Sequence, residues 1–171
     1  MERNNAVTMK GVSLTLVGEE IKIGVKAPDF RALDQTLKDV SLSSFEGKIV
    51  VLAAVPSLDT PICDLQIKRF NDEAAKLSKD IKVLFISMDL PFAQKRFCQE
   101  FNINNVTVLS DHRDADFAFK YGVLIKELRL LSRAVFVVDR MGEIRYVEYV
   151  KEIGDQPNYD SVLKAIGEID G

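Results

Sequence analysis

The stretch from Ile49 to Val55 constrains the fold of this chain more than any other part of the sequence. It reads Ile-Val-Val-Leu-Ala-Ala-Val, so it is apolar at every position and not only at alternate ones. Such a run is typical of a central strand whose two faces are both covered by other elements. Pro61 suits the first position of a helix, because the N–H that proline lacks would have no partner there. The sequence therefore predicts a buried strand over residues 48–55 and a helix over residues 61–77.

Cys63 falls in the first turn of this predicted helix, and Thr60 falls at the N-cap position before it. The first N–H groups of a helix have no partner within the helix, and threonine is a common capping residue. These donors and the positive end of the helix dipole favour a thiolate over a thiol. A nearby cation would favour the thiolate further, and Lys126, Arg129 and Arg133 are all candidates. The pattern indicates a nucleophilic cysteine.

Turn residues divide the rest of the chain into short strands and helices. We expect an N-terminal hairpin over residues 7–16, with its turn at Lys10-Gly11. The other expected elements are strands over 30–33, 39–42, 82–88 and 106–109, helices over 91–101 and 114–120, a hairpin over 134–150 and a final helix over 159–169. This order indicates an α/β fold with a mixed central sheet and helices on both faces.

Composition narrows the classes of function. The 171 residues are expected to form a single domain, residues 1–171, and the net charge of −3 offers no basic patch for nucleic acid. The longest apolar run is far shorter than the roughly 20 residues that span a membrane, and the N-terminus has no secretory pattern. A cytoplasmic location is therefore expected, where cysteines are more often redox-active than structural. Two cysteines and one histidine do not supply a zinc site, so no metal is expected.

The motif Pro56-x-x-x-Thr60-x-x-Cys63 resembles the peroxidatic-cysteine signature of the peroxiredoxins. Residues 22–30 resemble the entry segment of the same family. Residues 55–61, 87–98 and 121–125 resemble one subgroup, the bacterial thiol peroxidases, which are atypical two-cysteine peroxiredoxins. The resemblance runs from about Val7 to Ile166. It implies a thioredoxin-like fold with the insertions that peroxiredoxins carry.

The resemblance also implies roles for five residues. Cys63 would attack the peroxide and become a sulfenic acid, and Cys98 would resolve it as an intramolecular Cys63–Cys98 disulfide. Arg133 would bind both the sulfur and a peroxide oxygen, Thr60 would orient the peroxide, and Pro56 would shield the sulfur from water. Without the resemblance, Cys98 would be read as a small buried hydrophobe and Arg133 as a partner in a surface ion pair.

The two cysteines fall on different predicted helices. Their Cα atoms are therefore expected to lie beyond the ~7 Å limit for a disulfide, so oxidation should require local unwinding of both helices.

The function that the resemblance implies is reduction of hydrogen peroxide and alkyl hydroperoxides. Thioredoxin would be the reductant, no cofactor would be needed, and the chain would form a homodimer. Leu58, Ile62 and Phe92 could line an apolar mouth for alkyl substrates, although each is equally a core residue.

Three other functions remain open or are disfavoured by the sequence. A peroxide sensor that relays oxidation to a partner protein would use the same two cysteines. A thioredoxin-fold scaffold with inert cysteines would leave Cys63 unreactive. A cysteine hydrolase would need His112 to activate Cys63, but His112 lies in a polar segment without a glycine-rich oxyanion loop, so a solvated loop histidine is favoured.

Overall fold

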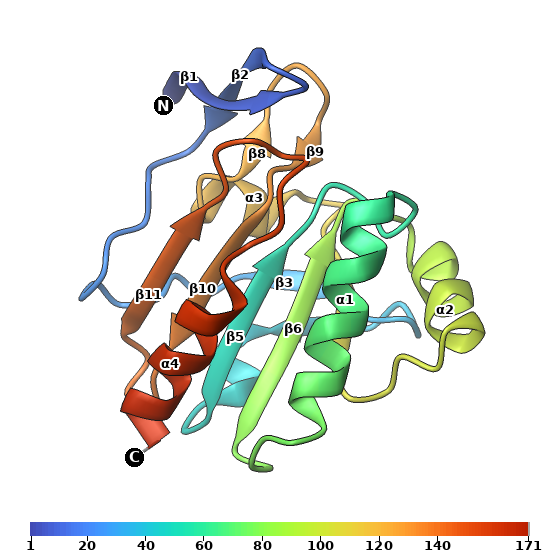
Figure 1. Cartoon of the computed structure of the whole chain (residues 1–171), viewed down its shortest axis with the longest axis vertical. Helices are drawn as coiled ribbons and strands as arrows, with labels where there is room; N and C mark the ends of the chain where they lie inside the picture. The colour runs from blue at the N-terminus through green and yellow to red at the C-terminus, as the bar shows by residue number, and fades with distance from the viewer. Residues whose placement is uncertain (171) are drawn as a thin grey trace.

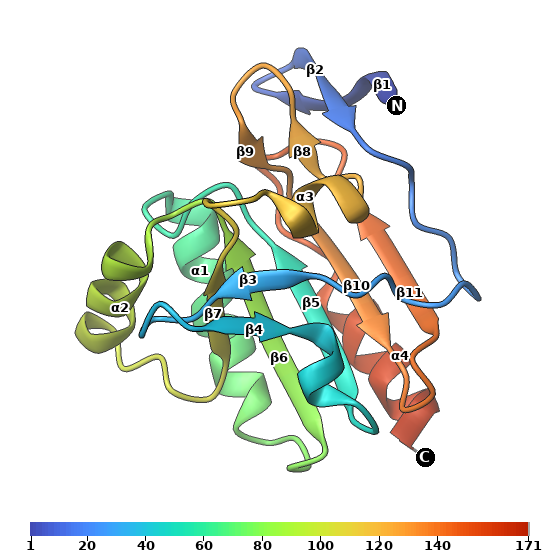
Figure 2. The same cartoon turned by 180° about the vertical axis from the view of Figure 1, so that it is seen from behind.

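The computed structural model describes residues 1–170 (Figures 1 and 2). Strands and helices alternate along most of the chain. In order they are β1 (Glu2–Met9), β2 (Val12–Val17), β3 (Arg31–Leu33), β4 (Asp39–Ser41), the 3-10 helix η1 (Leu42–Phe45), β5 (Ile49–Ala54), α1 (Pro61–Ala74), β6 (Ile81–Ser87), α2 (Pro91–Glu100), β7 (Thr107–Ser110), α3 (Asp116–Lys120), β8 (Leu124–Ile125), β9 (Leu130–Leu131), β10 (Ala134–Val138), β11 (Ile144–Tyr149) and α4 (Tyr159–Asp170).

A mixed sheet forms the centre of the molecule, with the strand order β11-β10-β5-β6-β7-β3-β4. Strands β5, β6 and β7 run parallel, whereas β10 is antiparallel to both β5 and β11. The carboxyl ends of the three parallel strands therefore meet at one edge of the sheet. The loops that lead into α1, α2 and α3 leave from that edge, so the first turn of α1 lies there.

Strand β5 confirms the prediction from its apolar run, since each of its residues is buried. Val50, Leu52 and Ala54 face a core that includes Phe117 and Tyr121 of the α3 region. The alternate residues, from Ile49 to Ala53, face the core beneath α1 and α4. Figure 1 shows α1 and α4 on one face of the sheet, and Figure 2 shows α3 on the other. The prediction of helices on both faces of a mixed sheet is confirmed.

A second sheet has the order β1-β2-β8-β9. The predicted N-terminal hairpin is present and longer than expected, with an irregular register between Arg3 and Val7. Strands β8 and β9 were not predicted, because two residues each are too few to show a periodic pattern. Leu16 and Val17 of β2 pair with Ile125 and Leu124 of β8, and this pairing joins the N-terminal hairpin to β8 and β9.

The helix boundaries differ from the sequence prediction by one to three residues. Helix α1 ends at Ala74, before the predicted end at Leu77. Helix α2 ends at Glu100, one residue before its predicted end, and buries Pro91, Gln94, Phe97 and Cys98. Phe101 lies beyond the end of α2 and is 39% exposed, with its ring 4.8 Å from that of Phe97. Among residues 1–170, no helix is long and apolar enough to cross a membrane.

Gly122 lies where two backbone segments approach closely, and this gives a testable prediction. Its φ is +64°, and a Cβ atom there would overlap the carbonyl oxygen of Glu19. Gly122→Ala should lower the free energy of unfolding by roughly 2 kcal/mol or more, because strain and overlap add. Gly47→Ala is the matched control, since its φ is +82° but nothing lies within 4 Å of the added atom. Urea unfolding that shows equal losses for both variants would contradict this account.

Candidate active site

The loop before α1 is held by a carboxylate from the next parallel strand. Asp89, just after β6, accepts hydrogen bonds from Ser57 Oγ at 2.7 Å, from Leu58 N at 2.9 Å and from Ser87 Oγ at 2.7 Å. Pro56, at the start of this loop, is buried. Sequence reasoning missed Asp89, because its partners lie in another part of the chain. Asp89 thus sets the path of the backbone that carries Thr60.

Asp89→Asn is expected to destabilise the fold by about 1–3 kcal/mol, because the amide replaces one acceptor oxygen with a donor. Asp59→Asn is the matched control, since Asp59 is exposed in the same loop. Urea denaturation with both variants measures the difference. A midpoint for Asp89→Asn that equals that of Asp59→Asn would show that the carboxylate does not hold the loop.

Thr60 occupies the N-cap position of α1 but does not cap it with its side chain. Its backbone is extended, with φ −97° and ψ 147°, and its carbonyl accepts the N–H of Asp64 at 2.9 Å. The hydroxyl instead donates to the carbonyl of Ser57 at 3.0 Å. The predicted position is therefore right and the expected role of the hydroxyl as a cap is wrong. Because the hydroxyl proton is donated to Ser57, the Thr60 oxygen can only accept further hydrogen bonds.

Cys63 lies in the first turn of α1 and is fully buried. Its Sγ accepts a hydrogen bond from Arg133 Nη2 at 3.3 Å. Arg133 is 1% exposed and also donates through Nη1 to Gln66 Oε1 at 2.6 Å and through Nε to the Ile153 carbonyl at 2.9 Å. Each of the three guanidinium nitrogens therefore donates to a different acceptor. Arg133 precedes β10, which pairs with β5, and this pairing brings it to the start of α1.

The charge of Arg133 is buried without a carboxylate. Among residues 1–170, no acidic oxygen lies within 4.0 Å of its guanidinium nitrogens, which is the limit for an ion pair here. A buried charge is costly unless an opposite charge accompanies it. A thiolate on Cys63 would supply that charge at the contacting atom.

Gln66 is a further residue of this site that sequence reasoning missed. It lies three positions after Cys63, on the same face of α1, and is fully buried. Its Oε1 accepts from Arg133, while its Nε2 has no partner within the described chain. A polar residue among the apolar residues Cys63, Ile67 and Phe70 was the available signal.

The other two cations named from the sequence lie elsewhere. Lys126 is exposed and pairs with Glu2 at 2.6 Å. Arg129 lies in the β8–β9 turn, with φ +51°. The structure therefore brings only Arg133 of the three to Cys63.

Cys98 lies on the buried face of α2, and both cysteines are free thiols in the same hydrophobic core. Gln35, in the β3–β4 turn, donates from Nε2 to Cys98 Sγ at 3.4 Å. Burial raises the pKa of the Cys98 thiol, and the hydrogen bond from Gln35 lowers it by a smaller amount, so the pKa is raised overall. Cys98 is therefore kept as a neutral thiol while α2 is intact.

A cavity of about 410 Å³ separates the start of α1 from α2. Its lining is mixed: Leu58, Pro61, Phe97 and Phe101 are apolar, whereas Thr60, Asp59, Asp64, Arg96 and Glu100 are polar or charged. The expected apolar mouth is only partly right. Ile62 does not line the cavity, and Phe92 is 67% exposed on the surface of α2.

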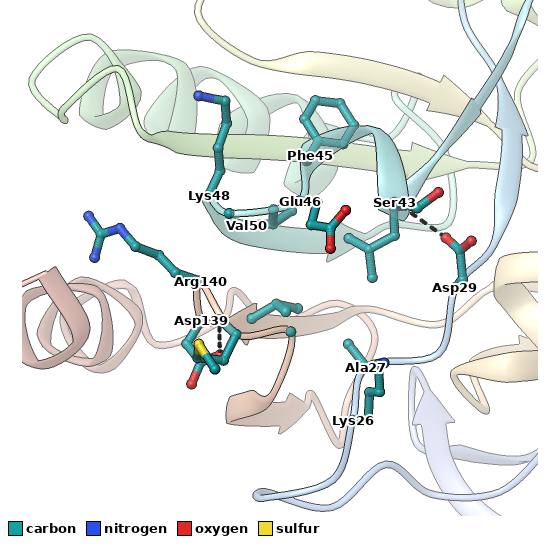
Figure 3. Close-up of a pocket in the computed structure, with 15 residues that line it drawn as sticks. Lys26, Ala27, Asp29, Ser43, Phe45, Glu46, Lys48, Val50, Asp139 and Arg140 are labelled. Atoms are coloured by element: carbon teal, nitrogen blue, oxygen red, sulfur yellow. Dashed lines mark hydrogen bonds between the residues drawn. The ribbon is translucent and has the colours of Figure 1, made fainter.

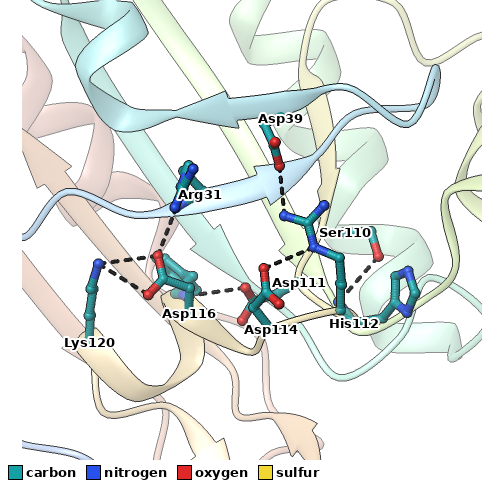
Figure 4. Close-up of polar contacts among 10 residues, drawn as sticks. Arg31, Asp39, Ser110, Asp111, His112, Asp114, Asp116 and Lys120 are labelled. Atoms are coloured by element: carbon teal, nitrogen blue, oxygen red, sulfur yellow. Dashed lines mark hydrogen bonds and ion pairs between the residues drawn. The ribbon is translucent and has the colours of Figure 1, made fainter.

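His112 belongs to a polar loop after β7 (Figure 4). The backbone N–H of His112 donates to Ser110 Oγ at 3.4 Å, and Arg113 beside it donates from Nη2 to Asp39 Oδ1 at 2.7 Å. Asp111 caps α3 by accepting the N–H groups of Phe117 and Ala118, and burial raises the pKa of Asp111 to about 6. The loop is thus organised around α3, and the structure shows no hydrogen bond from His112 to Cys63 among residues 1–170.

A second cleft, of about 430 Å³, lies at the opposite end of β5 from Cys63 (Figure 3). It is lined by residues of the 26–29 segment, by η1 and by the β10–β11 turn. Asp29 accepts the N–H of Ser43 at 3.0 Å, and Lys48 and Arg140 pair with Asp80 and Asp170. Neither cysteine lines this cleft.

Comparison with known proteins supports one family for the whole chain. The Redoxin family model matches residues 22–163. The thiol peroxidase of Bacillus subtilis is 50% identical over 159 residues, which are 93% of this chain and 95% of that protein. The thiol peroxidase of Oceanobacillus iheyensis is 52% identical over 162 residues, with coverage of 95% and 98%.

Solved structures agree with this assignment. A peroxiredoxin-like protein from Aquifex aeolicus superimposes with a TM-score of 0.91 at 44% identity, over 96% of this chain and 97% of that one. A thiol peroxidase from Chromobacterium violaceum gives a TM-score of 0.85 at 25% identity, over 95% of each chain. The predicted thioredoxin-like fold with peroxiredoxin insertions is confirmed. The chain belongs to the Redoxin family and, within it, to the bacterial thiol peroxidases, which are thiol-dependent enzymes of the peroxiredoxin type.

Proposed function

We propose that this chain reduces hydrogen peroxide and alkyl hydroperoxides with Cys63 as the nucleophile. The observation that carries the proposal is the hydrogen bond from the buried, carboxylate-free guanidinium of Arg133 to Cys63 Sγ at 3.3 Å. A cation held at that atom stabilises a thiolate, which is the reactive form of cysteine.

In the first step, the Cys63 thiolate attacks one peroxide oxygen. An S–O bond forms while the O–O bond breaks, and the other oxygen leaves as water or an alcohol after it takes a proton. Arg133 stabilises the charge that moves from sulfur to oxygen. The Thr60 hydroxyl oxygen accepts a hydrogen bond from the O–H of the bound peroxide, because its own proton is donated to the Ser57 carbonyl. Pro56, buried beside this loop, helps to keep water from the sulfur.

In the second step, Cys98 attacks the Cys63 sulfenic acid. An S–S bond forms, the S–O bond breaks, and water leaves. Both sulfurs are buried within helices, so the first turn of α1 and part of α2 unwind before the Cys63–Cys98 disulfide forms. The raised pKa of Cys98 keeps it out of the first step, since a neutral thiol is a poor nucleophile. Thioredoxin then reduces the disulfide by thiol–disulfide exchange.

The alkyl group of an organic hydroperoxide would lie in the cavity between α1 and α2. Leu58, Phe97 and Phe101 give that cavity apolar surface next to Thr60. The enzyme would act in the cytoplasm as a homodimer and would form a single domain, with no resident cofactor.

A Cys98→Ser variant tests this cycle. It should consume one equivalent of peroxide as the wild type does, because Cys63 and Arg133 are unchanged. Turnover with thioredoxin and thioredoxin reductase should fall at least roughly tenfold, since no intramolecular disulfide can form. NADPH consumption measures turnover, and non-reducing mass spectrometry reports the disulfide. Full turnover in this variant would refute the assignment of Cys98.

A further inference from the structure

The segment from Val150 to Gly154 connects the site around Cys63 with the N-terminal hairpin. The carbonyl of Ile153 accepts the Nε–H of Arg133 at 2.9 Å. The N–H of the same residue donates to the Thr8 carbonyl in β1 at 2.8 Å. Its side chain is 4% exposed and packs in a separate core with Val7, Leu14 and Leu16 of the hairpin. One residue therefore contacts both Arg133 and the hairpin.

The hairpin holds this segment by several further contacts. Thr8 N donates to the Lys151 carbonyl at 2.8 Å, and Lys151 Nζ donates to the carbonyls of Asn5 at 3.1 Å and Ala6 at 3.2 Å. Figure 1 shows the chain rising from the end of β11 toward the hairpin before it turns down into α4.

Glu152 adds a carboxylate to these contacts. It accepts from Gly11 N at 2.9 Å, from Thr8 Oγ1 at 3.2 Å and from Gly154 N at 3.0 Å. The bonds from the N–H groups of Gly154 and Gly11 lower the pKa of Glu152, so it is ionised at neutral pH. Glu152 therefore ties the turn that holds Ile153 to β1 and to the turn of the hairpin.

We propose that the N-terminal hairpin sets the position of Arg133 through this segment, and that Glu152 and Ile153 are positioning residues for the peroxide site. The proposal rests on the roles proposed above for Cys63 and Arg133. A guanidinium is planar, with its N–H groups in fixed directions. The acceptors on Ile153 and Gln66 hold Nε and Nη1, and they therefore determine the direction of Nη2. Nη2 is the nitrogen that donates to Cys63 Sγ. A displacement of about 1 Å at such a contact costs up to roughly 10²-fold in rate.

The test uses Glu152→Ala and Ile153→Ala in the Cys98→Ser background. Two quantities are measured: the second-order rate of Cys63 with hydrogen peroxide, by competition against a haem peroxidase, and the pH dependence of Cys63 alkylation by iodoacetamide. Both variants should react with peroxide about tenfold more slowly. The pH of half-maximal alkylation should rise, because the cation that favours the thiolate is less well held. Glu152 is only half-buried, so Glu152→Ala keeps the fold even if Ile153→Ala does not.

Two controls separate positioning from general destabilisation. Ile144→Ala removes the same side chain from a fully buried site at the other end of β11, in a different core. Lys126→Met breaks the Lys126–Glu2 pair on the hairpin without touching the 150–154 segment. Both should leave the rate within twofold and the alkylation profile unchanged.

Two results would overturn the proposal. The first is that Glu152→Ala and Ile153→Ala both keep the wild-type rate with peroxide and the wild-type alkylation profile. The second is that Ile144→Ala changes the rate and the alkylation profile as much as these two variants do. If the parent protein did not react with peroxide at all, the proposed function would fail. The alkylation profile would still report whether the hairpin positions Arg133, so the two failures are distinguishable.

Discussion

Cys63→Ser is expected to reduce peroxide consumption to the uncatalysed background, a loss of at least roughly 10³-fold. The hydroxyl that replaces the thiol is not ionised at neutral pH, and serine cannot pass through a sulfenic acid. Cys98 cannot substitute, because burial raises the pKa of its thiol and holds it neutral in α2. The remaining thiol should therefore survive one equivalent of hydrogen peroxide.

A colorimetric thiol count and a peroxide assay on the same sample measure this outcome. Cys98→Ser is the matched control, since it also has one cysteine but keeps the Arg133 contact to Cys63. The control should lose its thiol quickly and the Cys63→Ser variant should not. Rapid oxidation of Cys98 in the absence of Cys63 would mean that the nucleophile has been misassigned.

Arg133→Lys should slow the reaction of Cys63 with peroxide by roughly 10²–10³-fold. Lysine keeps the charge but presents a single ammonium group, which cannot hold Gln66, Ile153 and Cys63 in three fixed directions. Arg133→Met should be slower still, because the cation at the sulfur is lost. Competition kinetics gives the rate, and circular dichroism shows whether the fold is retained.

Arg129→Met is the matched control for Arg133, since it removes a cation from the β8–β9 turn. It should react at the wild-type rate. A folded Arg133→Met variant with wild-type reactivity would contradict the view that this guanidinium activates the thiolate.

The elements that the sequence predicted best are those with strong local signals. The uninterrupted apolar run of β5 and Pro61 at the start of α1 define a strand and a helix without reference to the rest of the chain. The position of Thr60 at the N-cap followed from the same local pattern. Strands β8 and β9 carry no such signal, because β8 exists through its pairing with β2 and β9 through its pairing with β8.

The geometry around Arg133 could not be derived from local pattern. Gln66 and Ile153 reach it from α1 and from the segment after β11, and a main-chain carbonyl leaves no trace in the residue type. Composition alone favoured a surface ion pair for Arg133, whereas the structure buries it without a carboxylate. The resemblance to a known family singled out Arg133, and β10–β5 pairing explains why it lies at Cys63.

The hydroxyl of Thr60 shows the same limit on a smaller scale. The residue type and its position favoured a side-chain cap on α1, but the hydroxyl donates to Ser57. The Asp89 carboxylate, which comes from the end of β6, fixes Ser57 and Leu58 and so determines that geometry.

A free-thiol count with intact-mass analysis, before and after one equivalent of hydrogen peroxide, tests the central claim most directly. The chain has two cysteines, both free and buried in the reduced protein. Loss of both thiols within one chain, a mass lower by two hydrogens, and recovery of both thiols with thioredoxin and its reductase are the predicted results. Two thiols that survive peroxide unchanged would contradict the Cys63–Cys98 cycle.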